Sequence, residues 1–358
     1  MAAISLCIPI LLTLVVSADD PVAPPPAPIA STPVKARDLA PAEEFVQVGT
    51  IETHVVRRGE RGRAIVLIHG FGSSTYTWRR NIDALARDFR VFAIDLKGFG
   101  LTAKPRDGEY HLAAYVDHLD ATLRTLGIER PILVGNSMGG AVAARFALLH
   151  PDRVAGLILV DAAPPDWSPS SGGRSLIGPL PGEPRDPDSK KTTTTRPPSK
   201  DDAAAANPLP NLGDRLRIAL ARTLVTRKMV AAGLASAYHD PKIVTPEMVE
   251  VYYRPFLIDG AVEALLAMSR GPLRAGTRTP PLSTLVPPAM IIWGRHDRII
   301  PVAAAERFAQ QLPRARKVIF EASGHLPHEE EPDRFNALAA EFAANPRWVE
   351  PTKDDRNP

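Results

Sequence analysis

The chain has 358 residues, of which 44% are hydrophobic, and it carries 43 Lys and Arg against 40 Asp and Glu. This is the composition of a globular protein with a large core, and the near balance of charge, without a dense basic run, argues against a nucleic-acid partner. A single cysteine, Cys7, excludes an intramolecular disulfide and any metal site built on several cysteines.

The N-terminal segment differs from the rest of the chain. Residues 1–18 form an uncharged apolar stretch that ends in small residues, as a signal peptide before its cleavage site does. This stretch, interrupted by Pro9, is short against the roughly 20 residues that span a bilayer. We therefore expect an exported protein, periplasmic or secreted, with membrane attachment through residues 1–18 as the alternative. Residues 19–41 are rich in proline, which predicts an extended linker.

From residue 42 onward, apolar strands alternate with helical stretches. Alternating apolar and polar residues around a glycine predict an antiparallel hairpin in "EFVQVGTIETHVVRRG". Buried strands are predicted in "AIVLIHG", "RVFAIDL", "PILVGN", "VAGLILVDA", "AMIIWG" and "RKVIF". Strands that alternate with helices in this way predict an α/β fold, with a mostly parallel, doubly wound sheet formed by residues 42–164 and 282–346.

The alternation stops in residues 165–281, which we expect to form an insertion. Its segment 168–211 is rich in Pro, Ser, Thr and charge, with too little apolar surface to offset the entropy of ordering, which predicts disorder. Helical periodicity then returns, and Thr245 followed by Pro246 is typical of a helix start. The sequence therefore predicts a helical cap over the sheet, and a polar tail at residues 347–358.

Ser137 stands between a predicted strand and a helix predicted from Met138 to Leu149. Gly135 and Gly139 bracket the serine as Gly-x-Ser-x-Gly, a pattern that suits a tight strand-to-helix turn. Such a turn pushes the serine outward beside a helix N-terminus, where free N–H groups can stabilise an oxygen anion. For this motif alone, a helix-capping serine with chance glycines is the simpler alternative.

Three further predicted strands are followed by polar residues, in "IHGFG" (68–72), "WGRHDRIIP" (293–301) and "ASGHLPHEEEP" (322–332). In open α/β sheets, the carboxyl ends of the strands form the edge where sites are built. The order Ser137, Asp297, His325 is the chain order of the triad in α/β hydrolases. With these four motifs in order, the chain resembles the α/β-hydrolase superfamily over about residues 45–345.

The residues of these motifs predict acyl chemistry at a serine. Ser137 would attack a carbonyl carbon, His325 would take and return the proton, and Asp297 would orient the imidazole and stabilise its positive charge. The backbone N–H groups of Phe71 and Met138 are expected to form the oxyanion hole. We expect neither a cofactor nor a metal at this site.

Four other residues near these motifs allow a second interpretation. Asp161 also ends a predicted strand and is the rival to Asp297 as the acid of the triad. Asp95 is expected to organise a turn, and the resemblance implies that His69 shapes the loop after its strand. His328 follows the predicted histidine at i+3, a spacing that suggests a metal, but no partner motif accompanies the pair. We therefore expect a solvated helix start here, with the acidic run that follows near the positive end of the helix dipole.

The nucleophile narrows the choice among hydrolases, because haloalkane dehalogenases and epoxide hydrolases place an aspartate at the position of Ser137. The motif "GNSMGG" is frequent in hydrolases that cleave carbon–carbon bonds of ring-fission products, and also in esterases. The loop "HGFGSSTYTW" resembles the esterase type. We therefore expect a carboxylic ester hydrolase for small to medium apolar acyl groups. The alternatives are a carbon–carbon bond hydrolase of ring-fission diketones and, from another class, a non-catalytic ligand receptor on the same fold.

Overall fold

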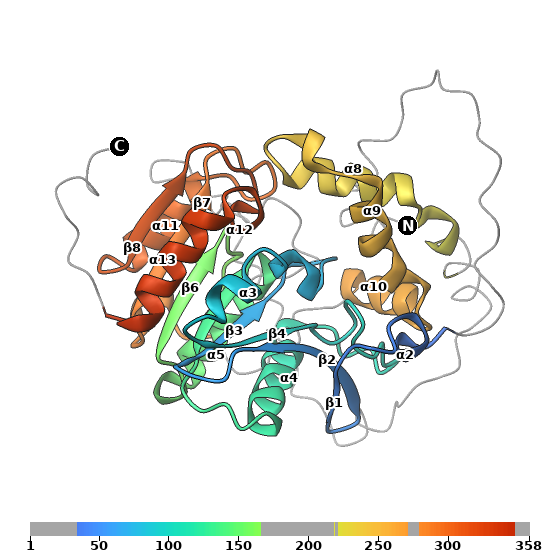
Figure 1. Cartoon of the computed structure of the whole chain (residues 1–358), viewed down its shortest axis with the longest axis horizontal. Helices are drawn as coiled ribbons and strands as arrows, with labels where there is room; N and C mark the ends of the chain where they lie inside the picture. Colours follow the sequence, from blue (N-terminus) through green and yellow to red (C-terminus); the bar gives the residue numbers. More distant parts are fainter. Residues whose placement is uncertain (1–33, 166–217, 219–220, 271–278, 348–358) are drawn as a thin grey trace, which may run out of the picture.

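The computed structural model describes residues 34–165, 218, 221–270 and 279–347 (Figure 1). The predictions for the signal or anchor segment, for the disordered segment, and for most of the linker and tail lie outside these ranges. No helix within them combines the length and the hydrophobicity needed to cross a membrane.

Within the described residues, eight strands form one sheet in the order β1-β2-β4-β3-β5-β6-β7-β8. The strands are β1 (Phe45–Val48), β2 (Ile51–Arg58), β3 (Ala64–Ile68), β4 (Arg90–Ile94), β5 (Ile132–Asn136), β6 (Gly156–Val160), β7 (Ala289–Gly294) and β8 (Arg316–Phe320). β2 pairs antiparallel with β1 and with β4, and the other neighbouring strands of this sheet are parallel. The predicted hairpin lies at one edge, and the predicted α/β fold class is confirmed.

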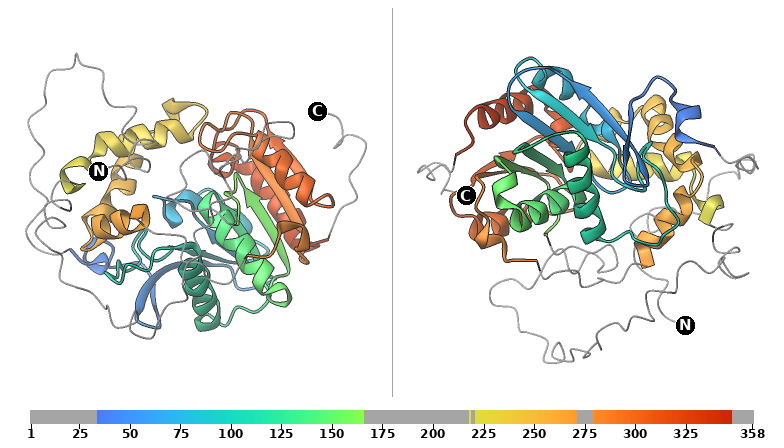
Figure 2. Two further views of the ribbon diagram at one scale, coloured as in Figure 1. Left: turned by 180° about the vertical axis from the view of Figure 1, so that it is seen from behind. Right: turned by 90° about the horizontal axis from the view of Figure 1, so that it is seen from below.

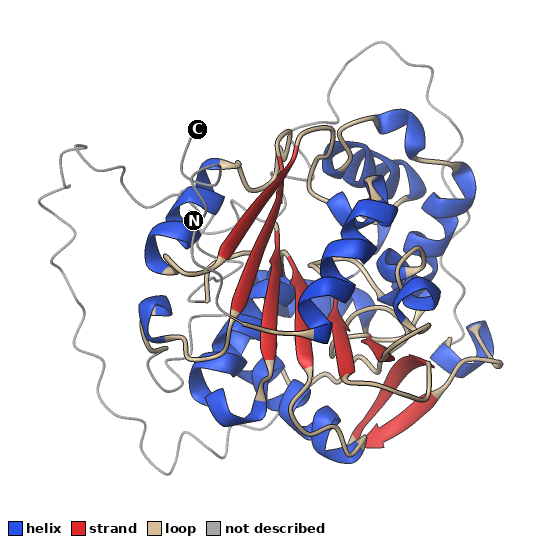
Figure 3. Cartoon of the chain, turned by 60° about the vertical axis from the view of Figure 1, so that its left-hand side comes forward, coloured by secondary structure: helices blue, strands red, loops and turns tan. Residues whose placement is uncertain are grey.

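Helices cover both faces of this sheet, as Figure 3 shows. They are α3 (Ile82–Leu85), α4 (Leu112–Thr125), α5 (Met138–Leu149), α11 (Ala303–Gln311), α12 (Pro327–Glu330) and α13 (Pro332–Ala344), with α2 (Ala36–Leu39) before the sheet and the 3₁₀ helices η1 (Thr75–Trp78), η2 (Pro151–Arg153) and η8 (Leu282–Thr284). Alternate residues of β3 point to opposite faces. Val66 and Ile68 pack with side chains of α4, α5 and α11, whereas Ile65 and Leu67 pack with α3 and α13.

The described part of the cap consists of α8 (Arg227–Ala237), η6 (Pro241–Ile243), α9 (Pro246–Tyr253), η7 (Arg254–Leu257) and α10 (Ala261–Arg270). The predicted helix start is confirmed, because the Thr245 side chain accepts the N–H of Met248 and Pro246 is the first residue of α9. Apolar side chains of the cap form a third cluster. In Figures 1 and 2 the cap helices stay together on one side of the sheet.

Candidate active site

Ser137 occupies a strained turn between β5 and α5. Its backbone has φ 54° and ψ −120°, a conformation that residues other than glycine adopt at a cost of about 1–3 kcal/mol. The turn is close-packed: a methyl group on Gly139 would lie 2.3 Å from the carbonyl oxygen of Ile68. One on Gly135 would lie equally close, 2.3 Å, to the carbonyl oxygen of Gly139. The two glycines of the motif therefore permit the turn, and the half-buried serine stands at its apex.

His325 is hydrogen-bonded to Asp297 in the loops after β8 and β7. The ring Nδ1 lies 2.7 Å from Oδ2 of Asp297, and both side chains are buried. The other oxygen, Oδ1, accepts the N–H groups of Ile299 at 2.7 Å and Ile300 at 2.9 Å. When the Nδ1–H group donates this hydrogen bond to the carboxylate, Nε2 of the neutral imidazole carries no proton and can accept one.

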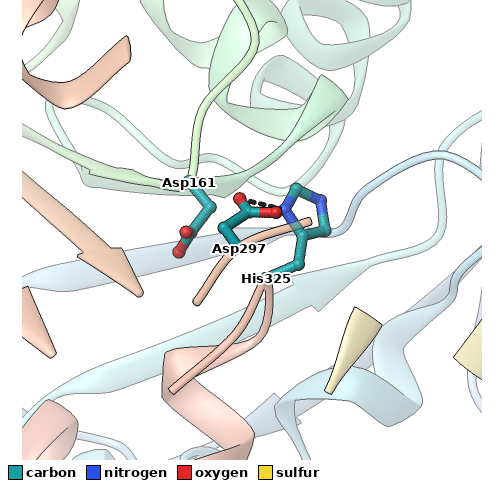
Figure 4. A group of neighbouring side chains, drawn as sticks. All are labelled: Asp161, Asp297 and His325. Carbon is teal, nitrogen blue, oxygen red and sulfur yellow. Dashed lines mark hydrogen bonds and ion pairs between the residues drawn. The ribbon is translucent and has the colours of Figure 1, made fainter. Parts of the chain in front are cut away.

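Asp161, the rival acid, lies on the far side of Asp297 from the imidazole (Figure 4). It is fully buried after β6, and its Oδ1 accepts the N–H of Gly294 at 3.0 Å. Burial and then the charge of Asp297 raise the pKa of the Asp161 carboxyl well above its usual range. Asp297 is thus the carboxylate that accepts the hydrogen bond of His325, and Asp161 lies behind Asp297.

The loop after β3 packs directly on the serine turn. A methyl group on Gly70 would lie 3.0 Å from Cβ of Ser137, so the loop backbone that carries Phe71 runs beside the serine. His69 holds this loop: its Nδ1 bonds to the carbonyl of Gly70 at 2.7 Å, and its Nε2 accepts the N–H of Leu96 at 3.0 Å. The role of His69 in shaping the loop is as expected.

Asn136 ties the serine turn to the histidine loop, and the sequence interpretation missed it. Its side-chain amide donates to the carbonyl oxygens of Val160 at 3.2 Å and His325 at 3.1 Å. The signal was present, since Asn136 is the second residue of "GNSMGG". The strand-end loops that carry Ser137 and His325 are therefore held together by a buried side chain.

Asp95 organises the turn after β4, as predicted. Its carboxylate accepts the N–H groups of Thr75 at 2.6 Å and Leu101 at 2.7 Å, and also bonds to Nδ1 of His54 at 2.7 Å. Burial acts to raise the pKa of Asp95, but the charge and hydrogen bond of His54 outweigh it and hold the pKa at about 2. This carboxylate is structural, because its hydrogen bonds tie together three segments of the chain.

Comparison with known proteins agrees with this geometry. The family model described as alpha/beta hydrolase fold matches residues 63–332. The chain belongs to the α/β-hydrolase family. It is 27% identical to a 2-hydroxymuconate semialdehyde hydrolase of Pseudomonas putida, over 82% of this chain and 90% of the relative.

Two further matches cover most of both proteins. A 2-hydroxy-6-oxononadienedioate/2-hydroxy-6-oxononatrienedioate hydrolase of Burkholderia vietnamiensis is 31% identical, over 83% of this chain and 93% of the relative. Among solved structures, a mutant of the meta-cleavage product hydrolase CumD from Pseudomonas fluorescens has a TM-score of 0.61 at 26% identity. The match covers 84% of this chain and 96% of that one.

The sequence prediction that His328 lies in a solvated helix start of this chain is wrong. The residue is fully buried, its ring lies 4.2 Å from that of Trp78, and its Nε2 is 3.0 Å from Oγ1 of Thr77. The reason is that the short helix α12 packs against η1 and α13 instead of facing solvent. Among the described residues, the group spaced closely enough for a metal consists of Asp161, Asp297 and His325, and it does not include His328.

Glu329 is also buried, and its carboxylate joins the cap to the core. We call it and its four partners the Glu329 cluster: Thr77 (2.5 Å), Arg79, Tyr238 (2.6 Å) and Tyr252 (3.2 Å). The two tyrosines belong to the cap, whereas Thr77 and Arg79 belong to the core. A buried carboxylate with a cation and three hydroxyl donors is fully satisfied, so it fixes the cap at one place above the site.

The surface between the triad and the cap is apolar. Leu326, next to His325, and Ile299, two residues after Asp297, pack into the apolar cluster of the cap. A small cavity between the loop after β3 and the cap is lined by apolar side chains, with the polar Ser73, Lys104 and Tyr252 among them; the apolar ones include Phe99, Phe256, Leu265 and Met268. The larger cavity, of about 380 Å³, is lined by His54, Asp95 and neighbouring residues. Neither cavity is lined by Ser137, Asp297 or His325.

Proposed function

We propose that this hydrolase cleaves the carbon–carbon bond beside the ketone of an enol-containing diketone acid. The observation that carries the proposal is the buried Asp297–His325 pair beside the strained Ser137 turn. It occurs in a chain whose relatives over most of its length include hydrolases named for 2-hydroxymuconate semialdehyde and 2-hydroxy-6-oxononadienedioate. Ester hydrolysis, the first expectation from the sequence, becomes the second candidate.

In the first half of the reaction, the Ser137 hydroxyl is the nucleophile. Its oxygen forms a bond to the ketone carbon while its proton passes to Nε2 of His325. Asp297 stabilises the resulting imidazolium through the hydrogen bond to Nδ1. The carbonyl oxygen becomes an oxyanion, for which we propose the backbone N–H groups of Phe71 and Met138 as donors, the latter at the first position of α5.

In the second half, the tetrahedral intermediate collapses and the carbon–carbon bond breaks. For this step the enol must first tautomerise, its proton moving to the carbon beside the ketone, so that the enol becomes the second carbonyl. The bonding electrons then pass through the conjugated chain to that carbonyl, and His325 returns its proton to the leaving fragment. Ser137 then carries an acyl group. Water, deprotonated by His325, attacks this ester, and the carboxylic acid leaves as the serine regains its proton.

Hydrolysis of carboxylic esters uses the same residues with an alcohol as leaving group. Two observations favour it as the second candidate: the esterase-like loop after β3 and the apolar side chains that line the cavity above that loop. The substrate would then be an ester of a small to medium apolar acid. Each methylene of the acyl group that the site buries would contribute about 0.8 kcal/mol to binding.

The test measures kcat/KM for two substrates on one preparation: a phenyl-substituted enol diketone acid and a nitrophenyl butyrate. We expect the diketone to be preferred by more than about tenfold, since the enol and acid groups are recognised only in that substrate. Efficient ester turnover with trace diketone cleavage would contradict the proposal and favour the esterase. Binding of both without any turnover would favour a receptor.

A further inference from the structure

A second carboxyl group lies behind the proposed catalytic acid, and the mechanism above gives it no role. One oxygen each of Asp161 and Asp297 and one ring nitrogen of His325 lie within 4.8 Å of one another. Figure 4 shows Asp297 between the other two side chains. The carboxyl group of Asp161 is thus close enough to Asp297 to influence its charge.

The two carboxyl groups differ in the hydrogen bonds that they accept. Asp297 accepts two backbone N–H groups and one ring N–H, so three donors face its two oxygens. Asp161 accepts one backbone N–H on Oδ1, while its Oδ2 is buried and has no hydrogen-bond partner in the described structure. An ionised oxygen buried in this way is costly, whereas a protonated oxygen can donate to a neighbouring carboxylate.

The charges around Asp161 also favour a proton on the carboxyl group of Asp161. Asp297 and Glu330 both act to raise the pKa of Asp161, in addition to burial. Glu330 itself accepts the backbone N–H groups of Gly324 and His239. On the other side of Asp297, the imidazole of His325 becomes positively charged during the proposed reaction. A single negative charge on Asp297 is therefore the stable arrangement.

We propose that Asp161 is a positioning residue that keeps its proton and donates it in a hydrogen bond to Asp297. The two carboxyl groups then carry one negative charge between them, and that charge faces His325. This inference rests on the triad role proposed above for Asp297. It has a second consequence: when Asp297 is neutral, Asp161 ionises and supplies a weaker, more distant charge to the imidazole.

The experiment is a double-mutant cycle on Asp161→Asn and Asp297→Asn in the full chain. The readout is the rate at which a fluorophosphonate labels Ser137, which reports on the triad whatever the natural substrate is. Asparagine at position 161 keeps an acceptor for Gly294 and a donor for Asp297, and asparagine tolerates the positive φ of 44° found there. Thermal unfolding of all four proteins checks that each is folded.

We expect D161N alone to slow labelling a few-fold, because an amide is a weaker donor than a carboxylic acid. D297N should slow it by about 10³- to 10⁴-fold. In the D297N background, D161N should slow it by at least about tenfold more, a coupling expected of side chains in contact. At acid pH the residual rate of D297N should also fall more steeply than that of the double variant, because only D297N keeps an Asp161 carboxylate that can take up a proton.

If D161N slowed labelling equally in the wild-type and D297N backgrounds, the inference would be overturned. The same holds if D297N and the double variant had the same pH profile of labelling. Glu330→Gln is the matched control, because it removes a nearby charge without removing a partner of Asp297; its effect should be additive with D297N. A wild-type protein in which Ser137 is not labelled would instead contradict the proposed triad. The two failures are therefore distinguishable.

Discussion

The sheet side and the cap side of the site are held together in different ways. On the sheet side, backbone geometry places Ser137, Asp297 and His325, each in a loop directly after a parallel strand. On the cap side, the Glu329 cluster unites side chains of segments far apart in sequence through a buried carboxylate. The proposed catalytic residues thus stand on the sheet scaffold, whereas the position of the cap depends on a few side-chain contacts that substitutions can remove one at a time.

The largest expected effect is on the sheet side. Ser137→Ala should lower kcat by at least about 10⁴-fold, because the nucleophile is lost and only the oxyanion hole and binding remain. The fold should persist, since the serine side chain is half-buried. Turnover of the substrate found active on the wild-type protein checks the first result, and thermal unfolding checks the second.

Ser283→Ala is the matched control for that variant, because Ser283 is exposed in η8. Its activity should equal that of the wild-type protein. Retained activity in Ser137→Ala would show that the nucleophile lies elsewhere and would remove the distinction between the two sides of the site.

On the cap side, Glu329→Ala should reduce the free energy of unfolding by about 3 kcal/mol. The change leaves the half-buried Arg79 charge and two tyrosine hydroxyls without their shared partner, and breaking a buried ion pair has a cost of this order. Urea unfolding measures it. Glu321→Ala, which breaks an exposed pair with Arg295, should have a much smaller effect. Equal losses for the two variants would mean that the Glu329 cluster does not fix the cap.

Substitutions that remove one tyrosine hydroxyl at a time separate the contributions of the Glu329 cluster to stability. Tyr238→Phe should cost about 1–2 kcal/mol of stability, and Tyr252→Phe less, because their distances to the carboxylate are 2.6 Å and 3.2 Å. Tyr253→Phe is the control from the same cap, since its ring packs on Arg227 and not on Glu329. Unfolding in urea compares the three variants, and the reverse order would contradict the assigned contacts.

The smallest effect concerns pH. Burial raises the pKa of Glu330 from 4.5 to about 7, although its hydrogen bonds to backbone N–H groups oppose the shift. Because the folded protein holds this proton more tightly than the unfolded chain, Glu330 stabilises the fold below about pH 4.5, and the contribution is lost as pH rises through about 7. Glu330→Gln should flatten the free energy of unfolding between these pH values. An unchanged slope in that variant would assign the pH dependence to other groups.

The sheet side could be predicted from the sequence because local rules determine it. Alternating apolar runs specify the strands, and the glycines around Ser137 specify a turn that larger residues cannot form. The rivalry between Asp161 and Asp297 was visible, but not their contact, which depends on how two strand-end loops lie relative to each other. The motif "GNSMGG" contains Asn136, but the pattern does not show that its side chain bonds to the backbone of His325.

The cap side could not be predicted in the same way. The acidic run after His328 has the pattern of a solvated first helical turn, and nothing local indicates that Glu329 is buried. Its partners Tyr238 and Tyr252 come from an insertion whose position no periodicity specifies. We expect substrate preference to depend on the same cap side chains, whose positions the motifs do not specify.

Covalent labelling by a fluorophosphonate, located by peptide mass spectrometry, identifies the nucleophile of the proposed triad. We predict one equivalent of label on Ser137, with labelling that is abolished in Ser137→Ala and strongly slowed in Asp297→Asn. Label on another serine, or equal labelling of Ser137→Ala, would contradict the claim that the loops after β5, β7 and β8 form the catalytic centre.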